Sequence, residues 1–187
     1  MNAYAIYAKQ LLQLVLSPSR GWEDIVASGS DPSKASARLM MPAFVLAAVS
    51  DFLRLIFDSE LALSEVVIGA VVTFVAYFVS FAISVQAFRT RLGKYLEVEP
   101  DKERNLTVIV YTMTLLAMST IVCNATPFSA IMSYILPLLI GLVAWKSAAL
   151  LRVKPDSEFG FAGFVMMFLA LPPVVIQSAF AWILAKA

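Results

Sequence analysis

The hydrophobic pattern of the chain consists of long apolar runs separated by short polar connections. Each run is close to or above the roughly 20 residues that cross a bilayer as an α-helix. The runs cover about residues 38–57, 63–88, 106–123, 128–151 and 161–185. We therefore predict an all-α integral membrane protein, a five-transmembrane-helix bundle, with residues 37–187 as its membrane domain.

The first part of the chain, residues 1–36, carries a different pattern. Apolar residues recur there at helical spacing, while Gln10 marks the opposite, polar side. Such a segment is too short to span, and it predicts an N-terminal amphipathic interfacial helix on the cytoplasmic side. Ser17 and Pro18 are typical of an N-cap followed by proline at the first helical position, so a second short helix should follow. Trp22 on that helix is suited to the headgroup level.

Prolines and small residues interrupt the apolar runs. Pro42 lies near the start of the first run, where a missing amide costs little. Pro172 and Pro173 fall inside the fifth run, where they must kink or break the helix and form a candidate hinge. A packing kink is the alternative interpretation. In the second run, Ser80 and Ser84 belong to a face of small residues that favours close helix packing within the chain.

The positions of Lys and Arg predict the orientation. Basic residues precede the first run and fill every second connection, so the positive-inside rule places the N-terminus in the cytoplasm and the C-terminus outside. The cytoplasmic connections would form a candidate contact surface for partners or anionic headgroups. Its basic residues are Arg89, Arg91, Lys94, Lys102, Arg104, Arg152 and Lys154. The alternative is that these charges only serve orientation.

Three charged residues lie near the outer end of the first run. Asp51, Arg54 and Asp58 are spaced three and four apart, so they share one helix face. Charges at membrane depth usually face the bundle interior or a wet cavity, which makes this a candidate polar membrane site. It would serve as a proton or ion relay or bind a polar headgroup. The alternative is a self-neutralising pair, with the Arg54 side chain reaching outward to the interface.

Composition narrows the function classes. The chain is 60% hydrophobic and 14% charged, outside the range of soluble domains, and its net charge of +1 argues against a nucleic-acid partner. There is no His and a single Cys, Cys123, so neither a disulfide nor a thiolate or imidazole zinc site is expected. No catalytic constellation or glycine-rich phosphate loop occurs. We expect no enzymatic activity, cofactor or metal.

A family resemblance begins with the segment Ser17–Ile25, which reads Ser-Pro-Ser-Arg-Gly-Trp-Glu-Asp-Ile and precedes the first run. Together with Tyr111 and its following hydroxyl residues, and with Ile135-Leu136-Pro137, it resembles the Yip (Rab-interacting protein) membrane family over nearly the whole chain. Tyr111 lacks the proline that often follows it, and the long acidic extension of eukaryotic members is missing. The resemblance implies a bacterial-type, five-span inner-membrane protein and supplies no catalytic residues.

Two functions stay open at this point. The first is a non-enzymatic, membrane-organising or interaction scaffold that contacts lipids, other membrane proteins or a second copy of itself. The second is a small transporter or channel that uses Asp51, Arg54 and the kink at Pro172 and Pro173. Replacing Asp51 by Asn would abolish flux under the second hypothesis and change only stability under the first.

Overall fold

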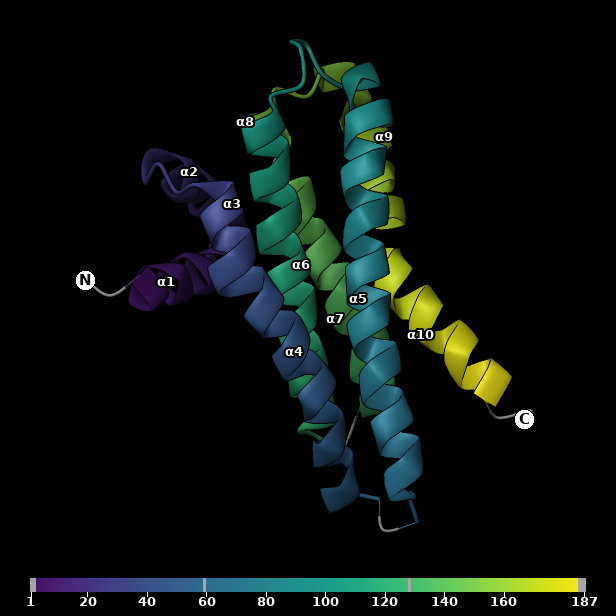
Figure 1. Cartoon of the computed structure of the whole chain (residues 1–187). Coiled ribbons are helices and arrows are strands. Elements are labelled where there is room, and N and C mark those ends of the chain that lie inside the picture. The colour runs from purple at the N-terminus through teal and green to yellow at the C-terminus, as the bar shows by residue number, and fades with distance from the viewer. Residues whose placement is uncertain (1–2, 59, 128, 185–187) are drawn as a thin grey trace.

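The computed structural model describes residues 3–58, 60–127 and 129–184. Within these ranges helices form almost all of the regular structure, and one isolated β-bridge joins two connections. The long helices run side by side as a bundle, and the first helix projects sideways from it (Figure 1). The prediction of an all-α membrane protein is confirmed.

Among the described residues, four helices are long and apolar enough to cross a membrane. They are Pro32–Ile56, Leu63–Lys94, Lys102–Asn124 and Pro155–Ile183. A fifth apolar helix, Ile131–Trp145, is shorter, because its residues rise only about 22 Å, less than the hydrocarbon core of roughly 30 Å. The protein is therefore an integral membrane protein by the length and composition of its helices, and the count of five spans stays a prediction.

The N-terminal part forms a helical hairpin. Helix α1 covers Ala3–Leu16 and α2 covers Pro18–Ala27. Pro18 begins α2 as predicted, but the Ser17 side chain makes no capping hydrogen bond. Gly21 lies at the crossing, where a Cβ atom would come within 2.7 Å of the Leu14 Cα. A glycine is therefore required for the two helices to approach this closely.

The first span is one continuous helix made of four pieces. They are α3 (Pro32–Ala35), the π-helical η1 (Ser36–Met40), α4 (Met41–Ser50) and the 3-10 helix η2 (Asp51–Ile56). Because the helix begins at Pro32, the expectation that Pro42 lies near its start is wrong. The π turn just ahead of this proline accommodates its missing amide, which is how helices commonly absorb an internal proline.

The next helices form the body of the bundle. Helix α5 covers Leu63–Arg91 and continues into the short η3 (Leu92–Lys94), and α6 covers Lys102–Asn124. Helix α7 covers Ser129–Trp145, and α8 (Ala148–Leu151) adds one turn. Helix α6 is the central one, since 67% of its apolar window is buried, against 28–39% for the other candidate spans. The hydrophobic core therefore follows α6.

The last span, like the first, contains a π turn ahead of its prolines. After the short η4 (Pro155–Ser157), helix α9 (Glu158–Val165) passes through the π turn η5 (Met166–Ala170) into α10 (Leu171–Leu184). Helix α10 leans away from the bundle beyond this turn (Figure 1). The double proline therefore bends the span without breaking it.

A side chain from α5 compensates for one missing proline amide. In an unbroken α-helix the carbonyl of Phe168 would accept from residue 172, which is a proline here. The hydroxyl of Ser84 donates to this carbonyl instead, at 2.7 Å. Ser80 and Ser84 are both fully buried. Their small face thus packs within the chain, as predicted.

Candidate polar membrane site

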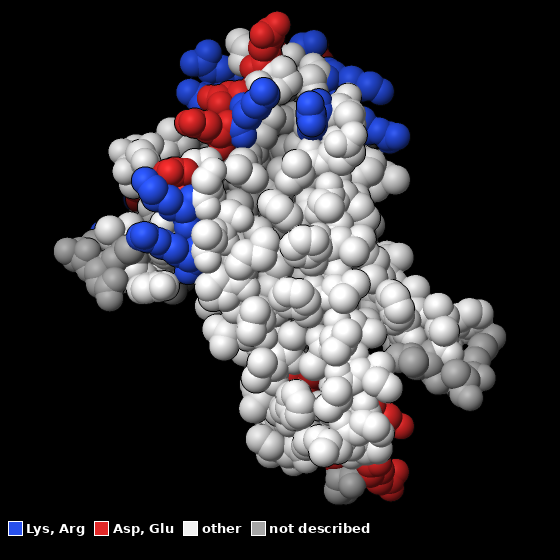
Figure 2. Space-filling view, in the orientation of Figure 1, with Lys and Arg blue, Asp and Glu red and all other residues white. Residues whose placement is uncertain are grey.

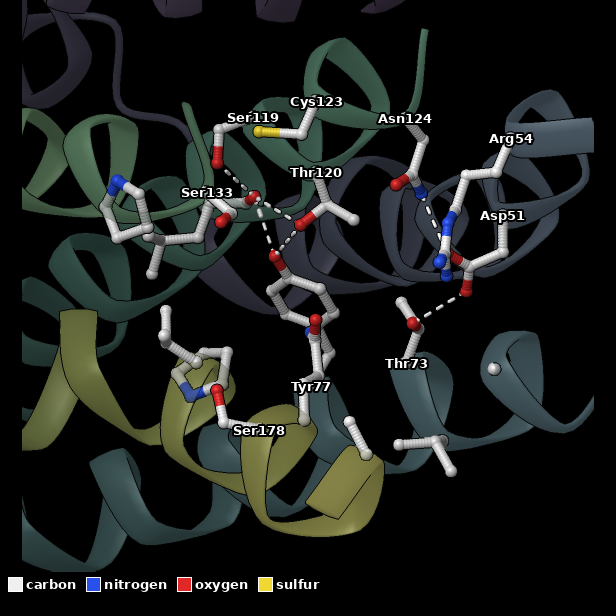
Figure 3. Close-up of a pocket in the computed structure, with 18 of the residues that line it drawn as sticks. Asp51, Arg54, Thr73, Tyr77, Ser119, Thr120, Cys123, Asn124, Ser133 and Ser178 are labelled. Carbon is white, nitrogen blue, oxygen red and sulfur yellow. Dashed lines mark hydrogen bonds between the residues drawn. The ribbon is translucent and has the colours of Figure 1, made fainter. Parts of the chain in front are cut away.

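A cavity of about 640 Å³ opens near the end of the bundle that carries Asp58, Glu60 and Glu65. We call it the Asp51 cavity (Figure 3). Its walls come from η2, α5, α6, α7 and α10. The polar residues that line it are Asp51, Arg54, Glu65, Thr73, Tyr77, Ser119, Thr120, Asn124, Ser133, Tyr134, Gln177 and Ser178.

Asp51 is the buried charged group of this cavity, with only 5% of the residue exposed. Thr73 on α5 donates its hydroxyl hydrogen to one carboxylate oxygen at 2.8 Å. The amide of Asn124, at the end of α6, donates to the other oxygen at 2.9 Å and also to the Ser50 hydroxyl at 3.0 Å. Three helices therefore meet at one carboxylate, and these bonds offset part of the cost of removing it from water.

The local helix type decides how Arg54 lies relative to Asp51. Because η2 is a 3-10 helix, residues three apart lie one above the other, about 6 Å apart along the axis. Both side chains line the cavity. Arg54 is exposed, and neither ion pair of the described residues, Lys34–Asp31 or Arg104–Asp101, involves it. The two charges thus share a face, as predicted, without forming the self-neutralising pair.

The wall opposite Asp51 is closed by hydrogen bonds within the protein. The Tyr77 hydroxyl donates to the carbonyl oxygen of Leu116 at 2.7 Å and lies 2.6 Å from the Thr120 hydroxyl. The Ser119 hydroxyl donates to the same carbonyl at 2.7 Å. The Tyr77 ring stacks on Phe44 with centroids 5.1 Å apart. Hydrogen bonds within the protein therefore occupy the hydroxyls of Tyr77 and Ser119 on this wall.

The other predicted residues of this region separate into two groups. Pro173 and Gln177 line the cavity, so the bend in the last span does shape the site. Asp58 is exposed in the turn after η2, does not line the cavity, and accepts a hydrogen bond from the Glu60 amide at 3.1 Å. Pro172 is outside the lining as well. Sequence spacing grouped Asp58 with Asp51, but the helix ends between them.

A second candidate surface lies at the opposite end of the bundle, where Lys and Arg gather in Figure 2. Two connections far apart in sequence, residues 89–104 and 152–158, meet there in an antiparallel bridge between Leu96 and Val153. The Glu97 amide donates to the Arg152 carbonyl at 3.0 Å, and the Lys154 amide donates to the Tyr95 carbonyl at 2.8 Å. We call this combined surface the loop face.

The seven basic residues predicted for this surface are not equivalent. Arg104 is half-buried, because its guanidinium pairs with Asp101 at 3.2 Å and donates to the Leu150 carbonyl at 3.2 Å. The Arg91 guanidinium carbon lies 5.5 Å from the centroid of the Phe168 ring. Both therefore hold the structure together. The other five predicted basic residues are exposed, namely Arg89, Lys94, Lys102, Arg152 and Lys154.

Sequence reasoning missed a third polar cluster, which we call the hairpin junction and define as Gln10, Trp22, Tyr111 and Val143. Trp22 is only 1% exposed, so its ring packs within the protein, and its position at the headgroup level stays a prediction. Its indole N–H donates to the Val143 carbonyl at 2.9 Å, and its ring meets Tyr111 edge-on at 6.5 Å. The Val143 carbonyl is available because the amide of Ser147 bonds to Ala144 instead.

Gln10 completes the hairpin junction. Its side-chain oxygen accepts from the Tyr111 hydroxyl at 2.6 Å, and its amide donates to Ser28 at 2.9 Å and Ser30 at 3.2 Å. Gln10 is thus buried, and the expectation that it lies on a free polar side is wrong. Trp22 and Tyr111 both belong to the motifs of the resemblance, but nothing in the sequence indicated that their rings meet.

A bundle with several helices long and apolar enough to cross a bilayer defines a multi-pass membrane protein. Residues 12–185 match the Yip1 domain family. Because this match covers most of the chain, the protein belongs to that family, and the resemblance is confirmed. Neither a curated protein nor a solved structure matches the chain.

Proposed function

We propose that this protein is a non-enzymatic scaffold that organises the membrane by contacting lipids and other membrane proteins. In this proposal it resides in a bacterial inner membrane, with its N-terminus in the cytoplasm and its C-terminus outside. The observation that carries the proposal is the loop face. Two connections separated by some fifty residues are held in one surface by backbone hydrogen bonds on either side of the Leu96–Val153 bridge.

Two features support an interaction surface over charges that only set orientation. The positive-inside rule depends only on how many basic residues lie near the span ends, and it requires no defined structure in the connections. Here the two connections are ordered against each other, and Arg152 adopts a left-handed backbone (φ 56°), which is uncommon for a residue with a side chain. A surface held in this way presents Lys94, Arg152 and Lys154 in a fixed arrangement, which suits recognition of an acidic partner or anionic headgroups.

The proposal is tested by photo-crosslinking in the native membrane. A photoreactive residue replaces Val98 on the loop face, which is 45% exposed, or Leu63 at the opposite end, which is 62% exposed. We expect discrete protein adducts at position 98, and we expect Lys94→Gln with Lys154→Gln to remove them. Lys9→Gln with Lys34→Gln is the matched control, since it removes two basic residues from the N-terminal part.

Adducts with lipid alone at both positions would contradict the scaffold proposal, and so would protein adducts that persist in the loop-face variant. An accessibility assay with the protein oriented in vesicles verifies in parallel that the double variants keep the wild-type topology. Without that control, a lost adduct could reflect inverted insertion.

The second candidate is a small transporter or channel, which the Asp51 cavity favours. The buried carboxylate of Asp51 shares the cavity with Pro173 of the proline-bent last span, and transporters use irregular helices of this kind to hold ions or substrates. This function predicts flux through proteoliposomes that Asp51→Asn abolishes while the thermal unfolding temperature stays close to that of the wild type. Flux that survives Asp51→Asn would exclude it.

A further inference from the structure

We propose that the Asp51 cavity binds the headgroup of a zwitterionic aminophospholipid, that is, a lipid carrying a primary ammonium group next to a phosphodiester. The proposal goes beyond the scaffold function and does not depend on the loop face. It rests on the size of the cavity, on the order of its charges and on its apolar walls.

The cavity has room for such a headgroup. Its volume of about 640 Å³ falls within the range of ordinary small-molecule sites. Gly69 lies beside the carboxylate, where a Cβ atom would be 3.8 Å from Asp51 Oδ2. The missing side chain leaves the approach to Asp51 open from the cavity.

Asp51 provides the ammonium position. An ionised carboxylate accepts about four hydrogen bonds, and the bonds from Thr73 and Asn124 use two of them. A primary ammonium group offers three N–H donors and would fill the remaining capacity. A quaternary ammonium group has no N–H donor, so the site should discriminate against choline headgroups.

Arg54 provides the phosphate position. Its guanidinium offers paired donors that match phosphate oxygens, and the 3-10 helix stacks it about 6 Å from Asp51 along the helix axis. The negative side chain of Asp51 would thus pair with the ammonium group of a zwitterionic headgroup, and the positive side chain of Arg54 with its phosphate. With Glu65 also on the rim, the cavity lining carries one positive and two negative charges, which disfavours purely anionic lipids.

The walls indicate a lipid as the source of this headgroup. Ile68, Val72 and Val174 line the cavity between its polar groups. Beside it, α10 exposes large apolar side chains such as Val175 (58%) and Phe180 (40%). Figure 2 shows acidic atoms recessed among uncharged side chains in the lower half of the molecule. A headgroup in the cavity would therefore leave its acyl chains against an apolar surface that already faces the membrane.

Native mass spectrometry of the purified protein tests the proposal, with equimolar phosphatidylethanolamine, phosphatidylcholine and phosphatidylglycerol supplied in nanodiscs. We expect preferential retention of one phosphatidylethanolamine. Asp51→Asn should reduce this retention at least about tenfold and remove the preference over phosphatidylcholine. Arg54→Gln should weaken both lipids alike. The matched control is Asp58→Asn, the same change outside the cavity, which should behave as the wild type.

A steric variant keeps the test independent of charge. Gly69→Val places methyl groups next to the carboxylate and should block binding, whereas Gly163→Val, where a Cβ atom meets nothing within 4 Å, should not. Equal retention of the three lipids by the wild-type protein would overturn the proposal, whatever the variants do. Displacement of the lipid by equimolar soluble glycerophosphoethanolamine would overturn the assignment to a lipid. Preserved retention in Asp51→Asn would overturn the role of the carboxylate.

Discussion

The hairpin junction and the Asp51 cavity are both places where polar side chains from different helices meet, but they are filled to different degrees. In the junction, the polar side-chain atoms of Gln10, Trp22 and Tyr111 each have a partner within the protein. In the cavity, the carboxylate of Asp51 has two partners and faces open space. A meeting of polar side chains from different helices therefore stabilises the fold where no space is left between them, and it forms a candidate binding site where a cavity remains.

This difference should appear as a difference in energy. A hydrogen bond shielded from water is stronger, and an unpaired group left by its removal is more costly, than the same bond next to water. Substitutions in the hairpin junction should therefore reduce stability most. Substitutions in the Asp51 cavity should change binding more than stability.

The largest effect is expected for Trp22→Ala. It removes a side chain that is 1% exposed and leaves the Val143 carbonyl without its donor. Loss of a buried aromatic side chain costs about 3–5 kcal/mol in the free energy of unfolding. Thermal or denaturant unfolding in detergent measures this cost, and Phe159→Ala, at a position 92% exposed, is the control. A cost below that of the control would show that the hairpin is not part of the cooperative fold.

Gly21→Ala should come next. Its Cβ would lie 2.7 Å and 2.8 Å from backbone atoms of Leu14, so α1 and α2 must separate. Overpacking of this kind costs about 1–3 kcal/mol. The matched substitution Gly163→Ala lies in α9 with open space around the new atom, and it should be neutral or stabilise the helix by up to about 1 kcal/mol. Equal effects of the two substitutions would contradict the close helix contact.

Tyr111→Phe and Thr73→Val compare the two clusters directly, since each removes one hydroxyl donor. Tyr111→Phe leaves the buried Gln10 oxygen unpaired and should cost about 1–3 kcal/mol. Thr73→Val removes a donor to Asp51, but water in the cavity can replace it, so we expect about 1 kcal/mol or less. Unfolding free energies of both variants in one detergent decide the order. A larger cost for Thr73→Val would mean that the cavity is closed to water.

The smallest effect is expected for Asp31→Asn, outside both clusters. The Ser33 backbone amide and the nearby Lys34 hold the pKa of the Asp31 carboxyl below its usual value. A carboxyl with a lowered folded-state pKa stabilises the protein above about pH 4, and the contribution disappears as the pH falls through the folded pKa. Asn caps a helix equally well, so the variant removes only the charge. The difference between the unfolding temperatures of the two proteins should therefore stay constant from pH 7 to about pH 4 and shrink below that pH.

Much of the fold could be predicted from the chain alone because a bilayer restricts it so strongly. Backbone groups in hydrocarbon must be paired within a helix, so an apolar run of sufficient length predicts a helix with little ambiguity. The exact limits depended on packing. Residues 32–37 are short of apolar side chains, yet they continue the first span because Pro32, Ala35 and Met40 are buried in the bundle.

The candidate site was only partly predictable. Helical spacing correctly placed Asp51 and Arg54 on one face, but it assumed 3.6 residues per turn and so included Asp58 as well. The 3-10 geometry of η2 and the end of the helix after Ile56 separate that residue from the cavity. Thr73 and Asn124, the partners of Asp51, carry no local sequence signal, since they come from two other helices.

The sequence by itself determined the membrane class, the helical architecture and the family, because hydrophobic length and short motifs act locally along the chain. The tertiary structure alone decided that Trp22 and Gln10 are buried, that two distant loops share one surface, and that Asp51 faces a cavity. Each of these depends on side chains from helices far apart in sequence meeting in space, and helix periodicity does not encode which neighbour each face will meet.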